Sequence, residues 1–463
     1  MISFSFEDIA VLIIFFALLL LIGFLSSKKS KDATDYLLAG RNLNLFFFVL
    51  VTVSTWYGGI LGVGEFTYRY GLLSWFTQGL PYYFFAFLFA VFFAKKIREA
   101  SLFTIPDKLF EVYGKNVSLF SAVIVFILVS PAPYLLMTAT LMKEIFHIDF
   151  LLALIISFIL SGSYLIRGGF RSNVYVDAFQ FFVMFVGFII AAVICFSSLG
   201  GTEFLSANLP SSHLKFTGDA SPAFIIVWFL IALWTFADPG FHQRAYAAKN
   251  GNIAKWGIII SIFFWAVFDF LTTSTGLFAR ALFPDLEHPV LAYPFLAEKI
   301  LSPGFKGLFY AGMFATIIST LNSFLFLSAT TIGRDFFYRL IPQLNDDKIK
   351  FFTSIGVLIS GIISILISFL IPSVVQIWYT IGSLFIPAII PAVVSAYYPK
   401  FRIAKRMMLI EMIISLFTGT IWFFIRDNFL NSFLYEIEPM LIGLSAAIVI
   451  HIIGLLGKFS LSD

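Results

Sequence analysis

Long apolar runs, separated by short polar or glycine- and proline-containing breaks, constrain this chain more than any other feature. Each run is about long enough to cross the hydrocarbon core of a bilayer as a helix. The expected spans are residues 8–26, 43–68, 72–94, 116–142, 149–166, 174–198, 222–243, 254–282, 305–333, 351–371, 374–397, 405–425 and 434–457. Because 60% of the residues are hydrophobic, the apolar surface also exceeds what a soluble core could bury. We therefore expect an all-α polytopic membrane protein of about 13 transmembrane helices, forming a single membrane domain over residues 1–463.

The basic residues are distributed unevenly between the two ends of these spans. Most lysines and arginines, including those in segments 28–31, 95–98 and 400–406, fall on one side, and few fall on the other. The positive-inside rule then predicts a plasma (inner) membrane protein with its N-terminus outside and its C-terminus in the cytoplasm.

The net charge of +4 is spread over short connections, so no nucleic-acid partner is expected. The single cysteine, Cys195, excludes an intramolecular disulfide.

Two spans are interrupted at corresponding points. The second reads "VTVSTWYGGILGVGEFTYRYG", with Gly58, Gly59, Gly62 and Gly64 in mid-span, and the seventh reads "LIALWTFADPGFHQR", with Asp238, Pro239 and Gly240 in sequence. They lie five spans apart, so they run in opposite directions, as an inverted five-helix repeat requires. Paired interruptions of this kind point to a transport site near the middle of the membrane. The alternative is that the glycines only allow helices to pack closely.

A hydroxyl-lined face runs along the stretch "FATIISTLNSF". On a helix, Thr316, Ser319, Thr320 and Ser323 fall at i, i+3, i+4 and i+7 and share one side. Such hydroxyls often bond only to carbonyls of their own helix. Several on one face can instead supply neutral oxygens to a hard cation.

Several motifs together resemble the sodium/solute symporter family, whose members include sodium:sugar and sodium:proline symporters. The motifs are "RNLNLFFFVLVTVSTWYGGILGVGEFTYRYG", "GGFRSNVYVDAFQ", "DPGFHQRAYAAKN", "GLFARALFP" and "FATIISTLNSFLFLSATTIGRDFF". The resemblance implies a leucine-transporter-like fold with a 5+5 inverted repeat. Its expected parts are an extra N-terminal helix at 8–26, a first repeat at 43–198 with core helices 1–5, a second repeat at 222–397 with core helices 6–10, and two C-terminal helices within 405–457.

The resemblance also implies a sodium site between core helices one and eight. Its expected ligands are the carbonyls of Thr52, Thr55 and Thr316 and the hydroxyls of Ser319 and Thr320. No carboxylate is placed in this shell to hold a proton, which favours sodium as the coupling ion, and no other cofactor is expected.

A second sodium site is found in some relatives, and Asp177, Asn322 and Ser323 match its positions. Asn322 departs from the Ser or Asp expected there, although it keeps an oxygen. Alternatively, Asp177 is an interfacial carboxylate near the start of its helix.

The same resemblance predicts a solute pocket at the interruptions. Gln78 matches a pocket position, whereas Gly59 and Trp265 stand where sugar carriers have hydrogen-bonding side chains, so glucose is not expected. Trp234 matches an aromatic that closes the inner side of the pocket, and Tyr379 is expected to face it.

Two further carboxylates, Asp269 and Glu65, lie near the interrupted spans or within a span. Asp269 lies within a span, where an ionisable group is costly and by default functional. It could pair with a substrate amine or serve as a hydrogen-bonded packing residue. Glu65 is expected to pair with Arg69 four residues on.

These features together predict a sodium-coupled secondary active symporter that imports a small organic solute by alternating access. An amino acid-like zwitterion is favoured over a monocarboxylate or a sugar. The alternatives are a proton- or other cation-coupled carrier on the same fold, and a solute-sensing membrane receptor. An enzyme is not expected, because the five histidines are scattered and no nucleophile–base pair is evident. The expected partners are the solute, sodium ions and the lipid bilayer, and the protein is expected to act as a monomer.

Overall fold

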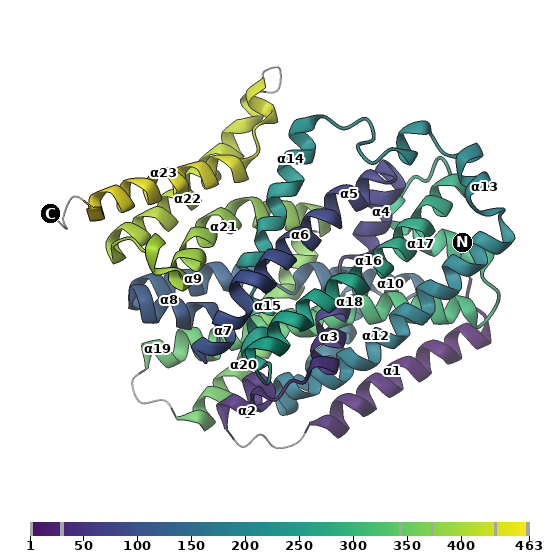
Figure 1. Cartoon of the computed structure of the whole chain (residues 1–463). Helices are drawn as coiled ribbons and strands as arrows, with labels where there is room; N and C mark the ends of the chain where they lie inside the picture. The colour runs from purple at the N-terminus through teal and green to yellow at the C-terminus, as the bar shows by residue number, and fades with distance from the viewer. Residues whose placement is uncertain (1–2, 28–31, 342–344, 372–373, 430–432, 460–463) are drawn as a thin grey trace.

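A computed structural model describes residues 3–27, 32–341, 345–371, 374–429 and 433–459, and every regular element in these residues is a helix (Figure 1). The helices in the first half of the chain are α1 (Phe6–Ser26), α2 (Ala33–Leu38), α3 (Leu45–Ser54), α4 (Ile60–Tyr70), α5 (Leu73–Gln78), α6 (Leu80–Phe89), α7 (Lys95–Ala100), α8 (Ile105–Tyr113), α9 (Lys115–Leu128), α10 (Ala132–Phe146), α11 (Phe150–Gly162), α12 (Leu165–Ser198) and α13 (Gly201–Asn208). Those in the second half are α14 (Pro222–Ile231), α15 (Pro239–Ala247), α16 (Gly251–Leu282), α17 (Ala292–Ile300), α18 (Phe305–Thr330), α19 (Tyr338–Leu340), α20 (Asp346–Leu370), α21 (Val374–Tyr397), α22 (Lys405–Ile425) and α23 (Pro439–Phe459).

The apolar helices lie where the sequence predicts spans. Within the described residues, eleven helical stretches are long and apolar enough to cross a membrane, and α3 and α11 are shorter apolar helices. Two boundaries differ from the prediction. The span expected at 174–198 belongs to α12, which starts at Leu165, is kinked at Gly169 and continues as helix to Ser198. The span expected at 116–142 is divided at 129–131 into α9 and α10. The number of spans, their orientation and the limits of the two repeats stay predictions.

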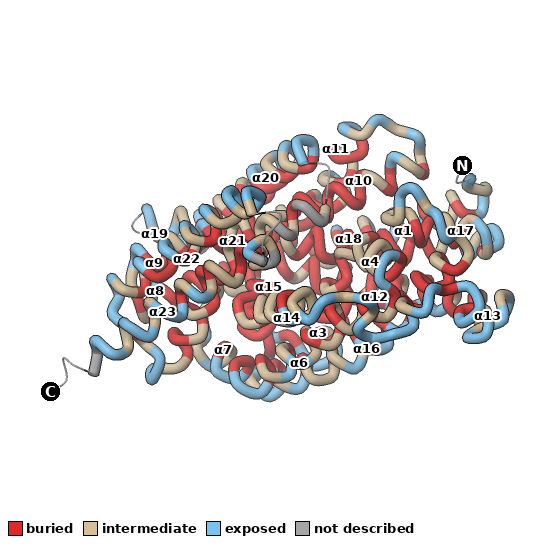
Figure 2. The backbone as a smooth tube through the Cα atoms, turned by 90° about the horizontal axis from the view of Figure 1, so that it is seen from above, coloured by how far each residue is buried: buried red, intermediate tan, exposed pale blue. Residues whose placement is uncertain are grey.

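Helix α18 forms the centre of the molecule, and nearly all of its residues are buried (Figure 2). It packs along α12, where Gly187 of α12 and Gly312 of α18 face each other. A Cβ atom built on Gly187 would lie 3.3 Å from the Cα atom of Gly312, so the two backbones approach closely. Small residues permit such packing in membrane helices, where no hydrophobic force drives helices together. The hydroxyl-lined face is therefore held in the protein interior.

Both predicted interruptions are present. Helix α3 ends at Ser54 and α4 begins at Ile60. Helix α14 ends at Ile231, and a 3₁₀ turn over Ala232–Phe236 leads to α15. The side chain of Asp238 accepts hydrogen bonds from the amides of Gly240, at 2.6 Å, and Phe241, at 3.2 Å, so it caps the restarted helix.

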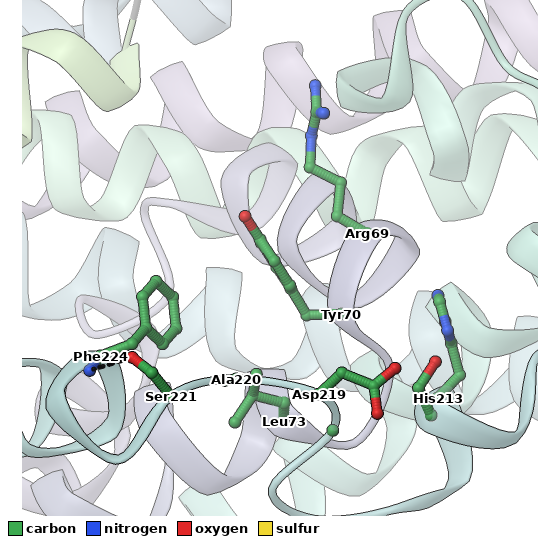
Figure 3. A pocket seen from close by; sticks show the side chains of 10 residues that line it. Arg69, Tyr70, Leu73, His213, Asp219, Ala220, Ser221 and Phe224 are labelled. Carbon is green, nitrogen blue, oxygen red and sulfur yellow. Dashed lines mark hydrogen bonds between the residues drawn. The ribbon is translucent and has the colours of Figure 1, made fainter. Parts of the chain in front are cut away.

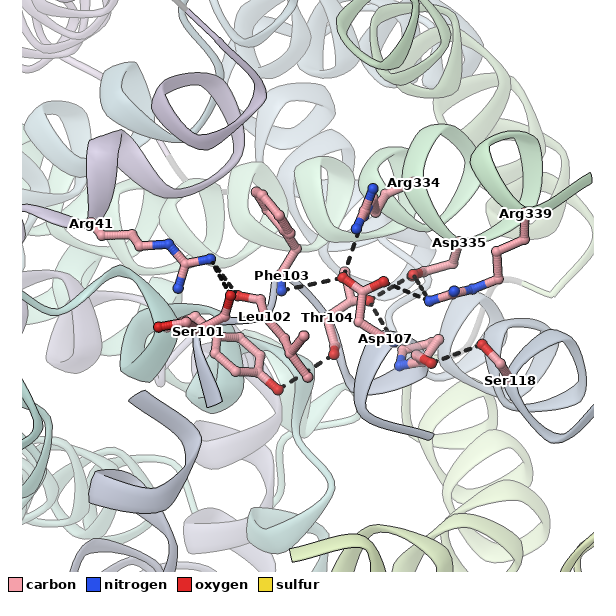
Figure 4. Close-up of polar contacts among 12 residues, drawn as sticks. Arg41, Ser101, Leu102, Phe103, Thr104, Asp107, Ser118, Arg334, Asp335 and Arg339 are labelled. Atoms are coloured by element: carbon pink, nitrogen blue, oxygen red, sulfur yellow. Dashed lines mark hydrogen bonds and ion pairs between the residues drawn. The ribbon is translucent and has the colours of Figure 1, made fainter. Parts of the chain in front are cut away.

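A buried charge network joins α8 to the end of the segment that follows α18 (Figure 4). Asp107 of α8 accepts from Arg334 at 3.3 Å and from Arg339 at 2.6 Å, while Thr104 donates to Asp335 at 2.6 Å. A buried carboxylate is tolerated when it is paired with cations, and Asp107 is paired with two arginines. The network fixes the basic end of the helix bundle.

Candidate functional site

The hydroxyl face of α18 meets the interruption that follows α3. The Thr320 hydroxyl donates to the carbonyl of Thr55 at 2.9 Å and lies 3.3 Å from the carbonyl of Thr316. This approach is possible because residue 58 is glycine. A Cβ atom there would lie 2.4 Å from the Cβ and Oγ1 atoms of Thr320. Three of the five predicted sodium ligands thus lie together, with spacings close to those of neighbouring oxygens around one small cation.

The remaining two predicted ligand residues are Thr52, in the last turn of α3, and Ser319, on α18. All five residues are buried, and the Thr52 hydroxyl has no hydrogen-bond partner among the described residues. The amide of Trp56 donates to Val53, at 3.2 Å, rather than to Thr52 as in an uninterrupted helix. The Ser319 hydroxyl lies 3.2 Å from the hydroxyl of Ser54. The structure therefore brings carbonyls of the broken helix and hydroxyls of α18 into one buried cluster.

Asp177 of α12 also belongs to this cluster. Its carboxylate accepts from the Ser319 hydroxyl at 2.7 Å and from the amide of Asn173 at 2.9 Å. Two sequence-based interpretations are therefore wrong. Asp177 is fully buried, about two turns beyond the break in α12 at Gly169, and is not an interfacial residue near a helix start. A carboxylate does adjoin the predicted sodium shell, since Ser319 contacts both groups.

Ser323 and Asn322, the other two residues of the predicted second site, have different hydrogen-bond partners. The Ser323 hydroxyl accepts from the Asn173 amide at 2.9 Å, which places Ser323 in the same network as Asp177. The Asn322 amide instead donates to the hydroxyl of Tyr164. Asn322 is thus directed to a different partner from Asp177 and Ser323.

Arg244 is a member of the cluster that sequence reasoning missed. It lies on α15, is 4% exposed, and donates to the hydroxyls of Thr55 and, at 3.3 Å, Ser323. Gly240 makes room for it, because a Cβ atom there would lie 2.7 Å from the Arg244 Nη1 atom. No role was expected for Arg244 from the sequence. Its position six residues after Asp238, on the helix that restarts after the interruption, was the available signal.

The predicted solute pocket contains packed aromatic rings. The ring of Trp56, in the first interruption, lies 4.9 Å from that of Trp265 and 5.1 Å from that of Tyr82, centroid to centroid. A Cβ atom on Gly59 would lie 2.3 Å from the ring of Trp378, so this glycine makes room for an aromatic side chain. The Trp265 indole nitrogen is buried without a partner among the described residues.

Asp269 lies at one edge of these rings. It is 9% exposed and accepts a hydrogen bond from the Tyr83 hydroxyl. A Cβ atom on Gly79 would lie 2.9 Å from its Oδ2 atom, which places the neighbouring Gln78 close to Asp269 in the fold. The amide nitrogen of Gln78 has no partner among the described residues. A hydrogen-bonded carboxylate and a free amide donor therefore adjoin the aromatic cluster.

Trp234, Tyr379 and Glu65 complete the predicted positions. Trp234 is partly exposed in the 3₁₀ turn, within hydrogen-bonding reach of the Asp238 carboxylate. The side chain of Tyr379 lies outside the described residues. Glu65 and Arg69 form the expected ion pair, at 2.9 Å.

A cavity of about 370 Å³ lies away from the predicted pocket, where the connection before α14 folds over the junction of α4 and α5 (Figure 3). Among its lining residues are Arg69, His213 and Asp219. The His213 ring contacts the Tyr68 carbonyl at 3.0 Å, and its burial lowers the pKa of the imidazole below its usual value. Burial therefore favours the neutral form of His213.

The fold matches that of a solved transporter. A Na⁺-coupled sialic acid symporter, solved in a substrate-bound outward-open state, superposes with a TM-score of 0.81 and 17% identity, covering 98% of both chains. This likeness confirms the expected leucine-transporter-like helical fold. The eleven long apolar helices found among the described residues, on this fold, place the chain in a membrane.

The model of the sodium:solute symporter family matches residues 36–414, and the chain belongs to that family. Sodium/myo-inositol cotransporter 2 of Bos taurus is 26% identical over 411 residues, which cover 78% of this chain. The chain spans about 60% of the length of that relative. The osmoregulated proline transporter OpuE of Bacillus subtilis (strain 168) is 26% identical over 480 residues, covering 97% of this chain and 95% of OpuE. Membership of a transporter family confirms that the chain is not an enzyme.

Proposed function

We propose that the protein is a sodium-coupled secondary symporter that imports a small organic solute by alternating access. The observation that carries this proposal is the contact of the Thr320 hydroxyl with the Thr55 carbonyl, at 2.9 Å, where the first core helix is interrupted. An ion bound there would join α18 to the broken helix, and its loss would free the two elements to separate. An ion that binds the joined arrangement more tightly than the separated one shifts the population toward the joined arrangement.

The proposed primary ion site consists of the carbonyls of Thr52, Thr55 and Thr316 with the hydroxyls of Ser319 and Thr320. A second sodium would take the carboxylate of Asp177 and the hydroxyl of Ser323, both of which hydrogen-bond to Asn173. Ser319 contacts Asp177 at 2.7 Å, so the two sites would share a ligand and influence each other.

A specific observation also favours a second candidate function, a proton-coupled carrier. Asp177 is a fully buried carboxylate next to the ion shell, and buried carboxylates are the usual proton carriers within membranes. Such a carrier would use the same fold and pocket, with Asp177 binding the coupling proton.

For the solute we favour an amino acid-like zwitterion over a monocarboxylate or a sugar. Asp269 could pair with an amine, and the rings of Trp56 and Trp265 could contact an apolar side chain or a cationic group. The predicted pocket therefore consists of Gly59, Gln78, Trp234, Trp265, Asp269 and Tyr379. The similarity to OpuE over nearly the full length of both chains is in keeping with a proline-like solute.

The test is uptake by the purified protein in proteoliposomes at clamped membrane voltage. Labelled proline, pyruvate, myo-inositol and glucose would each be offered with sodium, with potassium, or with an inward proton gradient. Sodium-dependent proline uptake is the expected result. Uptake driven equally well by protons without sodium would support the second candidate, and transport of only the polyol or sugar would overturn the zwitterion assignment.

A further inference from the structure

The start of α3 and the start of α16 are held side by side by backbone hydrogen bonds. The amide of Leu43 donates to the Ala247 carbonyl at 3.0 Å, and the amide of Lys249 donates to the Leu43 carbonyl at 2.9 Å. Beyond this bridge lies a cavity of about 440 Å³. It is lined by Leu45, Asn250, Asn252, Ile253, Trp256 and Ile260. It belongs to neither the ion cluster nor the aromatic cluster.

The walls of this cavity suit a hydrocarbon chain at the edge of a bilayer. Leu45 is 38% exposed and Trp256 is 53% exposed, and the adjoining Phe46 is 59% exposed. Ile253, Trp256 and Ile260 follow one another at i, i+3 and i+7 along α16, so they form an apolar strip that runs from the helix start. Tryptophan is enriched where the polar headgroups of a membrane meet its apolar core. The strip leads inward from that level.

The rim of the cavity is basic. Lys95 packs against Gly251, where a Cβ atom would lie 2.7 Å from the lysine Cγ atom. Arg98 donates to the carbonyls of Ala248 and, at 3.3 Å, Lys249. Lys255 places its ammonium group 5.9 Å from the ring centroid of Trp256. One carboxylate, that of Glu99, lies 3.9 Å from Lys95, and the sequence has no acidic residue in 41–54 or 245–262.

We propose that this cavity binds an anionic phospholipid. The phosphate would lie at the rim between Lys249 and Lys255, and one acyl chain would follow the strip of Ile253, Trp256 and Ile260. The exposed amides of Asn250 and Asn252 can donate to ester or phosphate oxygens. A zwitterionic lipid would gain the apolar contacts without the charge complementarity. Because the Leu43 bridge joins the two helix starts, a bound lipid would hold the ends of α3 and α16 together.

The test measures lipid binding directly and does not depend on the transported solute. The purified full-length protein in detergent would be titrated with phosphatidylglycerol, with phosphatidylcholine of the same acyl chains, and with inorganic phosphate. Melting temperature and native mass spectrometry would report binding. Phosphatidylglycerol should raise the melting temperature and remain bound, and the other two should have little effect.

Two sets of variants test whether the lipid binds at this cavity. Exchanging Lys249→Gln together with Lys255→Gln should weaken phosphatidylglycerol binding roughly tenfold or more, because each basic residue near the surface contributes about 1 kcal/mol. The matched control exchanges Lys400→Gln and Lys405→Gln, which are exposed lysines on other elements, and should bind as the unmodified protein does. Trp256→Leu should also weaken phosphatidylglycerol binding, because it removes an aromatic wall of the cavity.

Three outcomes would overturn the proposal. They are equal stabilisation by the two lipids, stabilisation by inorganic phosphate alone, and undiminished phosphatidylglycerol binding in the Lys249 and Lys255 variant. Should the double variant fail to fold, each single exchange and the Trp256→Leu variant provide the same comparison.

Discussion

Single hydroxyl groups decide the proposed ion chemistry, and α18 carries hydroxyls of two kinds. The Thr316 hydroxyl bonds to the Met313 carbonyl of its own helix at 2.7 Å, as membrane-helix hydroxyls commonly do. The Ser319 and Thr320 hydroxyls contact other elements. Only the latter two are expected to contribute to ion binding through their side chains.

The first prediction compares these hydroxyls. Thr320→Ala and Ser319→Ala should each raise the sodium concentration for half-maximal uptake, by roughly tenfold, if a lost ligand costs about 1.5 kcal/mol. Thr320→Ser should restore most of the affinity, because it keeps the oxygen. Thr316→Ala is the matched control, since its carbonyl is the expected ligand, and should leave the sodium dependence nearly unchanged. Equal behaviour of all four variants would contradict the assignment.

Asp177 distinguishes the two coupling schemes. If it binds a second sodium, Asp177→Asn should reduce the steepness of the sodium dependence while leaving one ion bound. If it carries the coupling proton, the same variant should lose proton-driven uptake and become insensitive to external pH. Uptake would be measured against sodium concentration and against pH, with the exposed Asp285→Asn as the control. An unchanged response to both would remove Asp177 from the ion pathway.

Replacing Trp234 and replacing Trp265 should have different effects, one on solute leakage and the other on stability. Trp265 is fully buried, so Trp265→Ala should lower the free energy of unfolding by about 3 to 5 kcal/mol. Trp234 is partly exposed, and as an inner gate its removal to alanine should increase sodium-free efflux from proteoliposomes with a near-normal melting temperature. A well-coupled but thermally fragile Trp234→Ala would identify this residue as a packing residue instead.

At the scale of elements, the molecule depends on how closely α18 approaches the first interruption. Gly58 permits that approach, and its replacement tests it. A methyl group in Gly58→Ala would lie 2.4 Å from Thr320, forcing α18 away from the Thr55 carbonyl, at a cost of about 1 to 3 kcal/mol. Sodium affinity should fall together with stability.

Gly62→Ala is the matched control for this exchange. Its methyl group would meet the ring of Trp378 at 3.1 Å, which a small ring displacement relieves. Melting temperatures measured with and without sodium would separate the two variants. A Gly58→Ala protein that sodium still stabilises fully would show that the contact is not needed for ion binding.

At the scale of the whole molecule, the connection over Ser211–Leu214 closes over the junction of α4 and α5. Gly71 permits this with a φ of +62°, and a Cβ atom there would lie 2.3 Å from the His213 backbone. His213 contributes a pH dependence. Burial lowers its pKa in the folded protein, so the folded state favours the neutral ring, and stability should fall as the pH drops below the unfolded pKa of about 6.5.

The measurement is the melting temperature between pH 8 and pH 5, compared with that of His213→Gln. Glutamine keeps an amide donor for the Tyr68 carbonyl and does not titrate in this range. The loss on acidification should therefore be smaller in the variant. Identical pH profiles would show that His213 does not make stability depend on pH.

Local patterns along the chain were enough to predict the helices, the two interruptions and the shared face of Thr316, Ser319, Thr320 and Ser323. The length of an apolar run and its glycine or proline breaks depend only on residues that are close in sequence. They can therefore be recognised without knowledge of the tertiary structure. The family resemblance added which oxygens to expect at the ion cluster. The Glu65–Arg69 pair was predictable for the same local reason, because i and i+4 always adjoin on a helix.

The tertiary structure alone decided which buried polar groups meet. Ser319 and Asp177 are 142 residues apart in sequence, and Arg244 and Thr55 are 189 apart. Desolvation requires that each such group find a partner, but it does not say which one. That choice depends on how α3, α12, α15 and α18 pack, and it placed a carboxylate beside the predicted ion ligands and an arginine within the same buried cluster. Sequence patterns report what each helix must bury, whereas only the packing of helices determines what is buried together.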